Sequence, residues 1–191
     1  TPDSQPNAWQ EYSYQNTAPG NGGSVDAYNT FAGGALSIGQ TVSINFGMRA
    51  LDPGTQAGLS LLNGSGNAIT FAIIGGGPDN YYYTDAGSTD ASAGAGLGYQ
   101  YQDDFYIAFT VTGAGTYSAT AFNGSGADNW TGTFSGSLIG MDVFDHAGGN
   151  GSDVAFNNLT VVPEPGTVAF LGIGLALLVG SRYRSSNAMR G

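Results

Sequence analysis

The chain contains no cysteine and no lysine, and His146 is its single histidine. Without cysteine the fold has no disulfide and no thiol nucleophile, and a zinc site, which needs several histidine or cysteine ligands, is excluded. A serine triad would depend on His146, which we interpret as a loop residue, and the sequence has no Gly-x-Ser-x-Gly turn to present the serine. The chain therefore offers no set of residues for nucleophilic catalysis.

Glutamate is also scarce, since Glu11 is the only one in residues 1–162. Jelly-roll glycosidases place two carboxyl groups around the scissile bond, commonly as glutamates on one face of a strand. Asp103 and Asp104 are adjacent, so in a strand they point to opposite faces and cannot flank one bond. We therefore expect that the protein is not an enzyme.

Basic residues are nearly absent from residues 1–162, where Arg49 stands against 13 carboxylates and the net charge is 1 − 13 = −12. This charge disfavours nucleic acid and anionic lipid as partners, because their phosphates would find no cations. It leaves divalent cations and basic proteins as candidates. About 160 residues suffice for one core. We expect a single domain over residues 1–162, with an irregular or edge-strand segment over residues 1–30.

The C-terminal region has a long uncharged stretch between Glu164 and Arg182. Its 17 residues, 165–181, would form about 25 Å of helix, a short span for a hydrocarbon core of about 30 Å. Arginine side chains can reach toward the headgroups and lengthen that span. We expect a linker over 163–167 and a transmembrane helix over 168–181.

The orientation of this helix follows from the arginines. Arg182, Arg184 and Arg190 come after the span, in a short basic tail over 182–191, and only Arg49 comes before it. The positive-inside rule therefore keeps the C-terminus in the cytoplasm and places the N-terminal domain outside the inner membrane. An outside domain requires export, so we interpret Thr1 as the mature N-terminus left by signal-peptide cleavage.

The order of features in the tail is informative. The tripeptide Pro163, Glu164, Pro165, an apolar stretch rich in glycine and leucine, and the basic residues Arg182 and Arg184 follow one another. This order resembles the PEP-CTERM sorting signal of exported Gram-negative bacterial proteins. The resemblance implies export, a transient inner-membrane anchor, and removal of the tail by an exosortase near Pro163 to Pro165. An ordinary single-pass anchor is the alternative interpretation.

Alternating apolar and polar residues dominate the rest of the chain, most clearly over residues 42–48 and 105–111. A period of two is typical of half-buried strands. Further strands are expected at residues 58–63, 68–74, 81–84, 97–102, 116–122, 130–134, 138–144 and 154–162. Asn63-Gly64 and Asn123-Gly124 lie between strands and favour two-residue hairpins with positive φ angles. We expect an all-β fold, an antiparallel β-sandwich of the jelly-roll type.

The order of these segments supports that fold. A strand at 41–48, the segment 56–64, and a last strand at 153–161 that runs into the sorting signal resemble the concanavalin A-like and laminin-G-like jelly rolls of many exported proteins. This resemblance implies the fold and a binding role.

A structural calcium ion is the one cofactor that the composition favours, because calcium prefers oxygen ligands. Carboxylate and amide oxygens are concentrated around a glycine-rich loop at Asp142, Asp145, Asn150 and Asp153. Asp79, Asp85 and Asp90 form a weaker candidate set. The alternative is that these acidic loops are simply solvated.

Aromatic residues near loops and strand ends suggest a surface for sugars, whose apolar faces stack on rings while Asp and Asn bind hydroxyl groups. The candidates are Tyr81, Tyr82, Tyr83, Tyr99, Tyr101 and Trp130. The alternative is that these rings pack the core, and at least one ring of the triple tyrosine run must face inward.

Gly172, Ala176 and Gly180 form a stripe of small residues on one face of the expected helix, which allows close helix packing. Two functions remain open. In the first, a non-catalytic subunit binds an inner-membrane protein complex through this helix and its periplasmic domain. In the second, a sorted envelope or matrix module binds glycan or exopolysaccharide. Self-assembly into a surface filament is a third hypothesis.

Overall fold

The computed structural model describes residues 9–12, 24–48, 51, 53–75, 81–88, 97, 104–124, 126–146 and 153–162. The linker, helix and basic tail expected over residues 163–191 lie outside this part of the chain, together with their sorting, topology and helix-packing residues. Within the described ranges, no helix has the length and apolarity that a membrane span requires.

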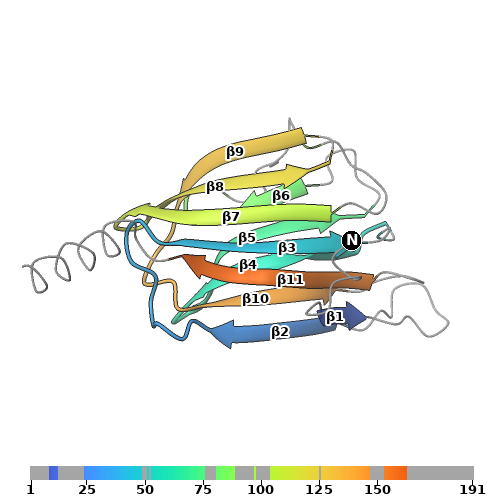
Figure 1. The fold of residues 1–191 in the computed structure, drawn as a ribbon, viewed down its shortest axis with the longest axis horizontal. Coiled ribbons are helices and arrows are strands. Elements are labelled where there is room, and N and C mark those ends of the chain that lie inside the picture. The colour runs from blue at the N-terminus through green and yellow to red at the C-terminus, as the bar shows by residue number, and fades with distance from the viewer. Residues whose placement is uncertain are drawn as a thin grey trace, which may run out of the picture.

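The described residues form eleven β-strands in two antiparallel sheets (Figure 1). The six-stranded sheet, sheet A, has the order β1-β11-β3-β7-β8-β9, and the five-stranded sheet, sheet B, has the order β2-β10-β4-β5-β6. Figure 1 views the sandwich from the side of sheet A. The strands are β1 (Trp9–Tyr12), β2 (Ser24–Thr30), β3 (Thr41–Met48), β4 (Gln56–Asn63), β5 (Gly66–Ile74), β6 (Tyr81–Thr84), β7 (Asp104–Gly113), β8 (Thr116–Asn123), β9 (Gly126–Thr133), β10 (Gly140–His146) and β11 (Asp153–Val162). The expected antiparallel sandwich is confirmed.

The alternation in the sequence determines which side chains fill the space between the sheets. Val42, Ile44 and Phe46 of β3 are 0–1% exposed, and they oppose Phe109, Ile107 and Phe105 of β7 in register. The residues between them point outward. One face of sheet A is thus apolar and the other is free to carry polar side chains.

Aromatic rings join the two sheets in the core. Phe46 of sheet A stacks on Phe105 with ring centroids 5.0 Å apart and meets Phe71 of sheet B edge-on at 6.2 Å. Trp130 of β9 stacks on Phe71 at 5.8 Å and on Tyr83 at 5.3 Å. These contacts fix the sheets face to face.

Both expected hairpins are present. Asn63 pairs with Gly66, and Asn123 pairs with Gly126, so each hairpin has a two-residue loop. In the first, the Oδ1 of Asn63 accepts a hydrogen bond from the Ser65 amide at 2.8 Å, and the positive φ falls on Gly66 (φ 125°) rather than on the Asn-Gly pair. The asparagine side chain therefore closes the turn as an Asx turn.

The N-terminal region contributes two edge strands. β1 lies at the edge of sheet A beside β11, and β2 lies at the edge of sheet B beside β10. β1 pairs only with the first half of β11, from Asp153 to Phe156. The second half of β11 therefore has no partner on that side among the strands that the structure describes.

A β-bulge divides β11. The pairing with β3 passes from Asn157 opposite Asn45 to Thr160 opposite Ser43, so β11 uses one residue more than β3 over this step. Asn158 takes the left-handed conformation (φ 54°), which asparagine tolerates better than most residues. The extra residue reverses the alternation, so that Val161 opposes the inward-facing Val42.

Candidate functional site

The outer face of sheet A carries two exposed aromatic side chains side by side. Tyr106 of β7 and Phe122 of β8 are register partners, and they are 40% and 51% exposed. Both point outward because their neighbours Phe105, Ile107 and Ala121 fill the core. The Cβ atoms of directly opposed residues in a sheet lie about 5 Å apart, so the two rings are neighbours on this face and form an aromatic platform.

Amide and hydroxyl groups surround this platform. Asn45 of β3 lies opposite Tyr106, and Asn157 of β11 lies opposite Asn45, so the row across the sheet continues as two amides. The adjacent rows contain Thr41, Ser43, Thr110, Ser118, Thr120, Asn129, Thr131 and Thr160. Thr120 donates to the Oδ1 of Asn129 at 2.7 Å, and the hydroxyls of Thr41 and Thr110 are 2.7 Å apart. None of these side chains carries a charge.

Such a face has a definite chemistry. Rings offer their faces to apolar C–H groups, while amides and hydroxyls donate and accept hydrogen bonds to ligand hydroxyls. We call the surface formed by Asn45, Tyr106, Thr120, Phe122 and Asn129 the Tyr106–Phe122 face. No described side chain in it can act as a strong acid or base, so its chemistry suits binding of a neutral, hydroxyl-rich ligand.

The aromatic residues that the sequence suggested mostly face the core. Tyr81 is 2% exposed and lies 5.0 Å from Phe105 between ring centroids, so it is excluded as a stacking platform. Tyr83 and Trp130 stack on each other and pack against the core. Tyr82 faces outward on sheet B and donates a hydrogen bond to Gln56. Tyr99 and Tyr101 lie outside the described residues.

The sequence analysis missed Tyr106 and Phe122, although a signal for both was present. Phe105, Ile107 and Phe109 alternate as inward residues, so Tyr106 must point out. The same parity in β8, where Tyr117, Ala119 and Ala121 are buried, turns Phe122 outward. Strand parity, rather than clustering of aromatics near loops, identifies the exposed rings.

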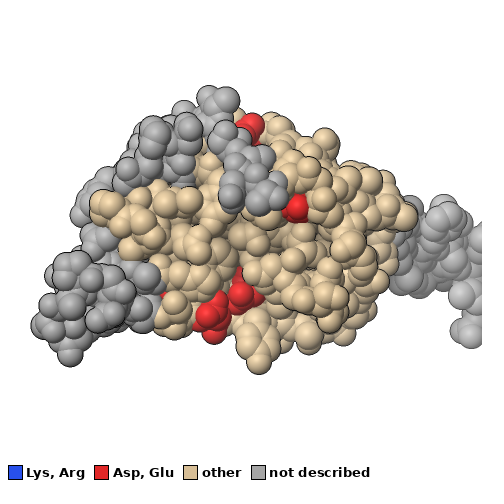
Figure 2. Space-filling model, turned by 180° about the vertical axis from the view of Figure 1, so that it is seen from behind, with Lys and Arg blue, Asp and Glu red and all other residues tan. Residues whose placement is uncertain are grey.

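A second polar cluster lies on the outer face of sheet B, the side seen in Figure 2, where red acidic atoms appear in a few places and no blue basic atom is visible. The Nε2 of His146 is 2.7 Å from the Oδ1 of Asp26. The Nδ1 of His146 lies 3.5 Å from the Nε2 of Gln56, whose Oε1 accepts the hydrogen bond from Tyr82. His146 is thus the last residue of β10 and not a loop residue, and its contacts lie on β2, β4 and β10, while Gln56 connects it to Tyr82 of β6.

Asp142 is also on this face and has an unusual environment. Burial raises its pKa to about 6, the negative charge of Asp26 contributes to that rise, and the proximity of His146 opposes it. Its Oδ1 is buried and makes no hydrogen bond. Burial thus brings the protonation of Asp142 closer to neutral pH than that of an exposed aspartate.

The structure describes the side chains of two of the four calcium ligands expected from the sequence, Asp142 and Asp145, and they face opposite sides of sheet B. Asp142 points outward from β10, whereas Asp145, three residues later, points inward and is 0% exposed. Asn150 lies outside the described residues, and the side chain of Asp153 is not among those described. The described part of the chain contains no group of three histidine or acidic residues placed to hold a metal. Residues three apart on a strand face opposite sides, which separates the two aspartates.

Asp85, from the second candidate set, has a structural role. Its Oδ1 accepts hydrogen bonds from the amides of Gly87 and Ser88, and its Oδ2 accepts from the hydroxyl of Tyr117 at 2.9 Å and the amide of Thr133 at 3.1 Å. Four donors thus occupy this carboxylate. Asp79 and Asp90 lie outside the described residues.

Comparison with protein families confirms the sorting signal. Residues 161–185 match the PEP-CTERM protein-sorting motif, which indicates an exported protein sorted to the membrane or cell surface. No curated protein matches the chain.

Comparison with solved structures gives the fold. A tetrameric galectin from Cinachyrella sp., a ball sponge, is 9% identical, with 73% of this chain and 100% of the galectin covered and a TM-score of 0.51. An alginate lyase from Corynebacterium sp. is 15% identical, with 71% of this chain covered and a TM-score of 0.49. The chain spans 61% of that lyase, which is less than two thirds of its length. A toad ovary galectin in complex with thio-digalactose is 16% identical, with 72% of this chain and 98% of the galectin covered and a TM-score of 0.47. At 9% identity the likeness to the sponge galectin shows the fold alone, an antiparallel β-sandwich of two sheets.

Proposed function

We propose that this exported protein is a non-catalytic binding module that recognises a neutral glycan on the Tyr106–Phe122 face, after delivery to the envelope by its C-terminal sorting motif. The observation that carries the proposal is the pair of exposed, register-matched rings within a surface of amides and hydroxyls. Stacking on the rings would hold the apolar face of a sugar, and Asn45, Thr120 and Asn129 would bind its hydroxyls.

Electrostatics favours a neutral ligand over a polyuronate. Residues 1–162 carry a net charge of 1 − 13 = −12, and their one arginine, Arg49, lies outside the described residues. An acidic polymer would meet repulsion over the whole domain and find no cation on the described part of sheet A. A neutral glycan meets no such repulsion.

The absence of a suitable carboxyl pair supports a binding role rather than catalysis. Glycoside hydrolysis needs two carboxyl groups facing each other across the ligand. The five side chains that define the Tyr106–Phe122 face include no carboxylate, and the buried Asp145 has no access to it because it belongs to sheet B. Asp104 lies two residues before Tyr106 in β7, and its side chain is not among those described.

The position of the last strand supports a module that survives removal of its tail. β11 ends at Val162, immediately before Pro163, so cleavage at Pro163 to Pro165 by an exosortase would leave all eleven strands in place. The alternative function, a permanent inner-membrane subunit, depends on the Gly172, Ala176 and Gly180 stripe, and none of the described residues favours it.

The test is a screen of the full chain against neutral and acidic glycans, followed by titration calorimetry with the best ligand. Tyr106→Ala and Phe122→Ala should each weaken binding by at least about fivefold, roughly 1 kcal/mol, as expected of an aromatic in the centre of a binding surface. Tyr28→Ala, which removes a ring that is 77% exposed on sheet B, is the matched control and should leave the affinity unchanged. Equal affinities for all four proteins would overturn the proposal, as would a ligand that binds sheet B.

A further inference from the structure

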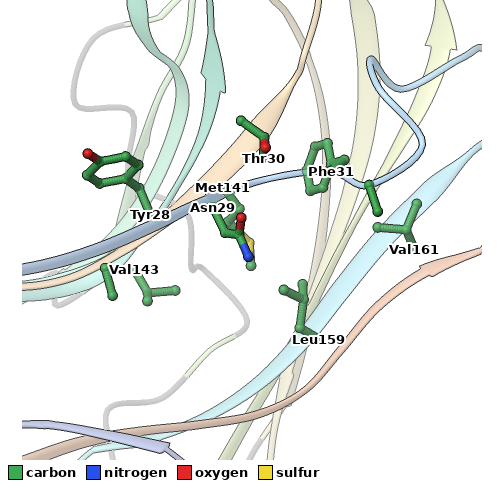
Figure 3. Close-up of a pocket in the computed structure, with 10 residues that line it drawn as sticks. Tyr28, Asn29, Thr30, Phe31, Met141, Val143, Leu159 and Val161 are labelled. Carbon is green, nitrogen blue, oxygen red and sulfur yellow. The ribbon is translucent and has the colours of Figure 1, made fainter.

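An apolar groove opens at one edge of the sandwich, between β2 of sheet B and the second half of β11 of sheet A (Figure 3). Its volume is about 580 Å³, within the range typical of ligand sites. Met141 and Val143 of β10 line its inner part, while Phe31, Leu159 and Val161 approach from the two sides. None of the residues that line the groove carries a charge.

The rim of the groove gathers much of the exposed apolar surface of the described residues. Tyr28 is 77% exposed, Leu159 43% and Val161 38%, whereas the exposed Val162 pairs with the outward-facing Thr41 and lies on the outer face of sheet A. Large apolar side chains collected in one patch on a soluble domain mark a surface that meets another apolar body.

The bulge in β11 creates this surface. If β11 continued without the extra residue at Asn158, Thr160 would point toward the other sheet and Val161 would point out. With the bulge, Val161 turns to the groove side and Thr160 joins the polar outer face of sheet A. The extra residue at the bulge is Asn158, in the left-handed conformation (φ 54°), and this bulge is what makes the groove apolar.

The chain itself indicates what lies next to the groove. The sorting motif begins at Val161, inside β11, and its uncharged apolar stretch begins at Val168. Five residues, 163–167, separate Val162 from Val168, so the six steps between their Cα atoms reach about 20 Å when fully extended. When this stretch enters a bilayer, as its sequence predicts, the groove is held close to the lipid headgroups.

Charge restricts which part of the domain can approach that surface. The domain is strongly acidic, and the outer face of sheet B carries Asp26 and Asp142. The residues that line the groove are uncharged. Tyr28, at the rim opposite Asp142, is of a residue type enriched at membrane interfaces because it has an apolar ring and a polar hydroxyl.

We propose that the β2–β11 groove docks on a neutral lipid surface, so that the sandwich sits edge-on at the base of its sorting tail. This orientation keeps the Tyr106–Phe122 face away from the bilayer and accessible to solvent. The inference is independent of the glycan proposal, because the groove lies at the β2–β11 edge and the Tyr106–Phe122 face lies on the outer surface of sheet A. A second copy of the chain, pairing along the free half of β11, is the competing occupant.

The absence of cysteine makes the test direct, because single cysteines can be introduced without background labelling. Thr30→Cys places an environment-sensitive fluorophore on the groove, and Thr131→Cys places it on β9, the opposite edge strand of sheet A. Both positions are exposed strand threonines, so they are matched. Each full-length protein is inserted into phosphatidylcholine nanodiscs containing lipids with a quencher on the acyl chain.

Docking predicts at least threefold stronger quenching at position 30 than at position 131. Adding Tyr28→Ser and Leu159→Ser to the Thr30→Cys protein should reduce its quenching to the level of the control, while circular dichroism shows the fold retained. Equal quenching at the two positions would overturn the proposal. Quenching that survives the serine substitutions would also overturn it, because tethering by the tail would then explain the proximity, and so would cross-linking between copies through position 30.

Discussion

Replacing Asp85 by alanine removes the carboxylate that links the end of β6 in sheet B to two strands of sheet A. Its Oδ2 accepts from Tyr117 of β8 and from the Thr133 amide of β9, and its Oδ1 accepts from the Gly87 and Ser88 amides. Tyr117 is 1% exposed, and burial raises the pKa of its phenol, so it stays protonated and acts as a donor. Without Asp85 this buried hydroxyl loses its acceptor.

The expected loss follows from the exposure of the four donors. A hydrogen bond to a charged acceptor contributes about 1.5–3 kcal/mol where water cannot replace it, which applies to the Tyr117 hydroxyl. The Gly87 and Thr133 amides are exposed and can form hydrogen bonds with water instead, so each adds only a few tenths of a kcal/mol to the loss. Asp85→Ala should therefore lower the free energy of unfolding by about 2–4 kcal/mol. Tyr117→Phe, which leaves three donors in place, should cost about 1–2 kcal/mol.

The assay is urea unfolding followed by tryptophan fluorescence, for Asp85→Ala, Tyr117→Phe and the double variant. The double variant should be less destabilised than the sum of the single variants by about 1 kcal/mol, because the two changes remove the same hydrogen bond. Calcium and EDTA should not shift any of the midpoints. Additive single effects, a loss below about 0.5 kcal/mol for Asp85→Ala, or a calcium dependence that vanishes in this variant would refute the reasoning.

Three further predictions concern single residues of the sandwich. The pKa of Asp142 is raised to about 6 in the folded state, so the stability that its protonation provides is present at acid pH and is lost as pH rises through 6. After allowance for solvent screening, Asp142→Asn should raise the free energy of unfolding by roughly 1 kcal/mol over the wild type at pH 7.5 and by little at pH 4. Unfolding measured across pH tests this. Asn158→Val should cost about 1–2 kcal/mol in unfolding experiments because β-branched residues disfavour φ near 54°, whereas Asn158→Gly should be nearly neutral. Gly58→Ala should sharply lower the melting temperature, because a Cβ at Gly58 would collide with the backbone of Phe71 and Ala72 in β5.

Local periodicity was enough to predict most of the strands, though not the bounds of β2 (Ser24–Thr30), and it did not predict the way they assemble. The spacing of Val42, Ile44 and Phe46 alone indicates an inward face, and the same parity places Tyr106 and Phe122 outside. It also separates Asp142 from Asp145, so these two aspartates cannot bind one calcium ion together.

The remaining features depend on pairings between distant parts of the chain. His146 meets Asp26 across 120 positions, and nothing in either segment specifies that neighbour. The groove depends on a single extra residue at Asn158, which alternation cannot reveal because a bulge changes the parity without changing the composition. Pairing between distant strands, rather than local sequence preference, determines both the His146–Asp26 contact and the groove.

The order of strands in sheet A also bears on how the protein folds during export. β11, the last strand to emerge in synthesis order, lies between β1 and β3, and β10 likewise lies between β2 and β4. Neither sheet can complete its strand order until its C-terminal strand has emerged, so we expect the sandwich to fold late in export. The residues that complete sheet A adjoin those that carry the sorting motif, which makes folding and recognition of the tail nearly simultaneous events.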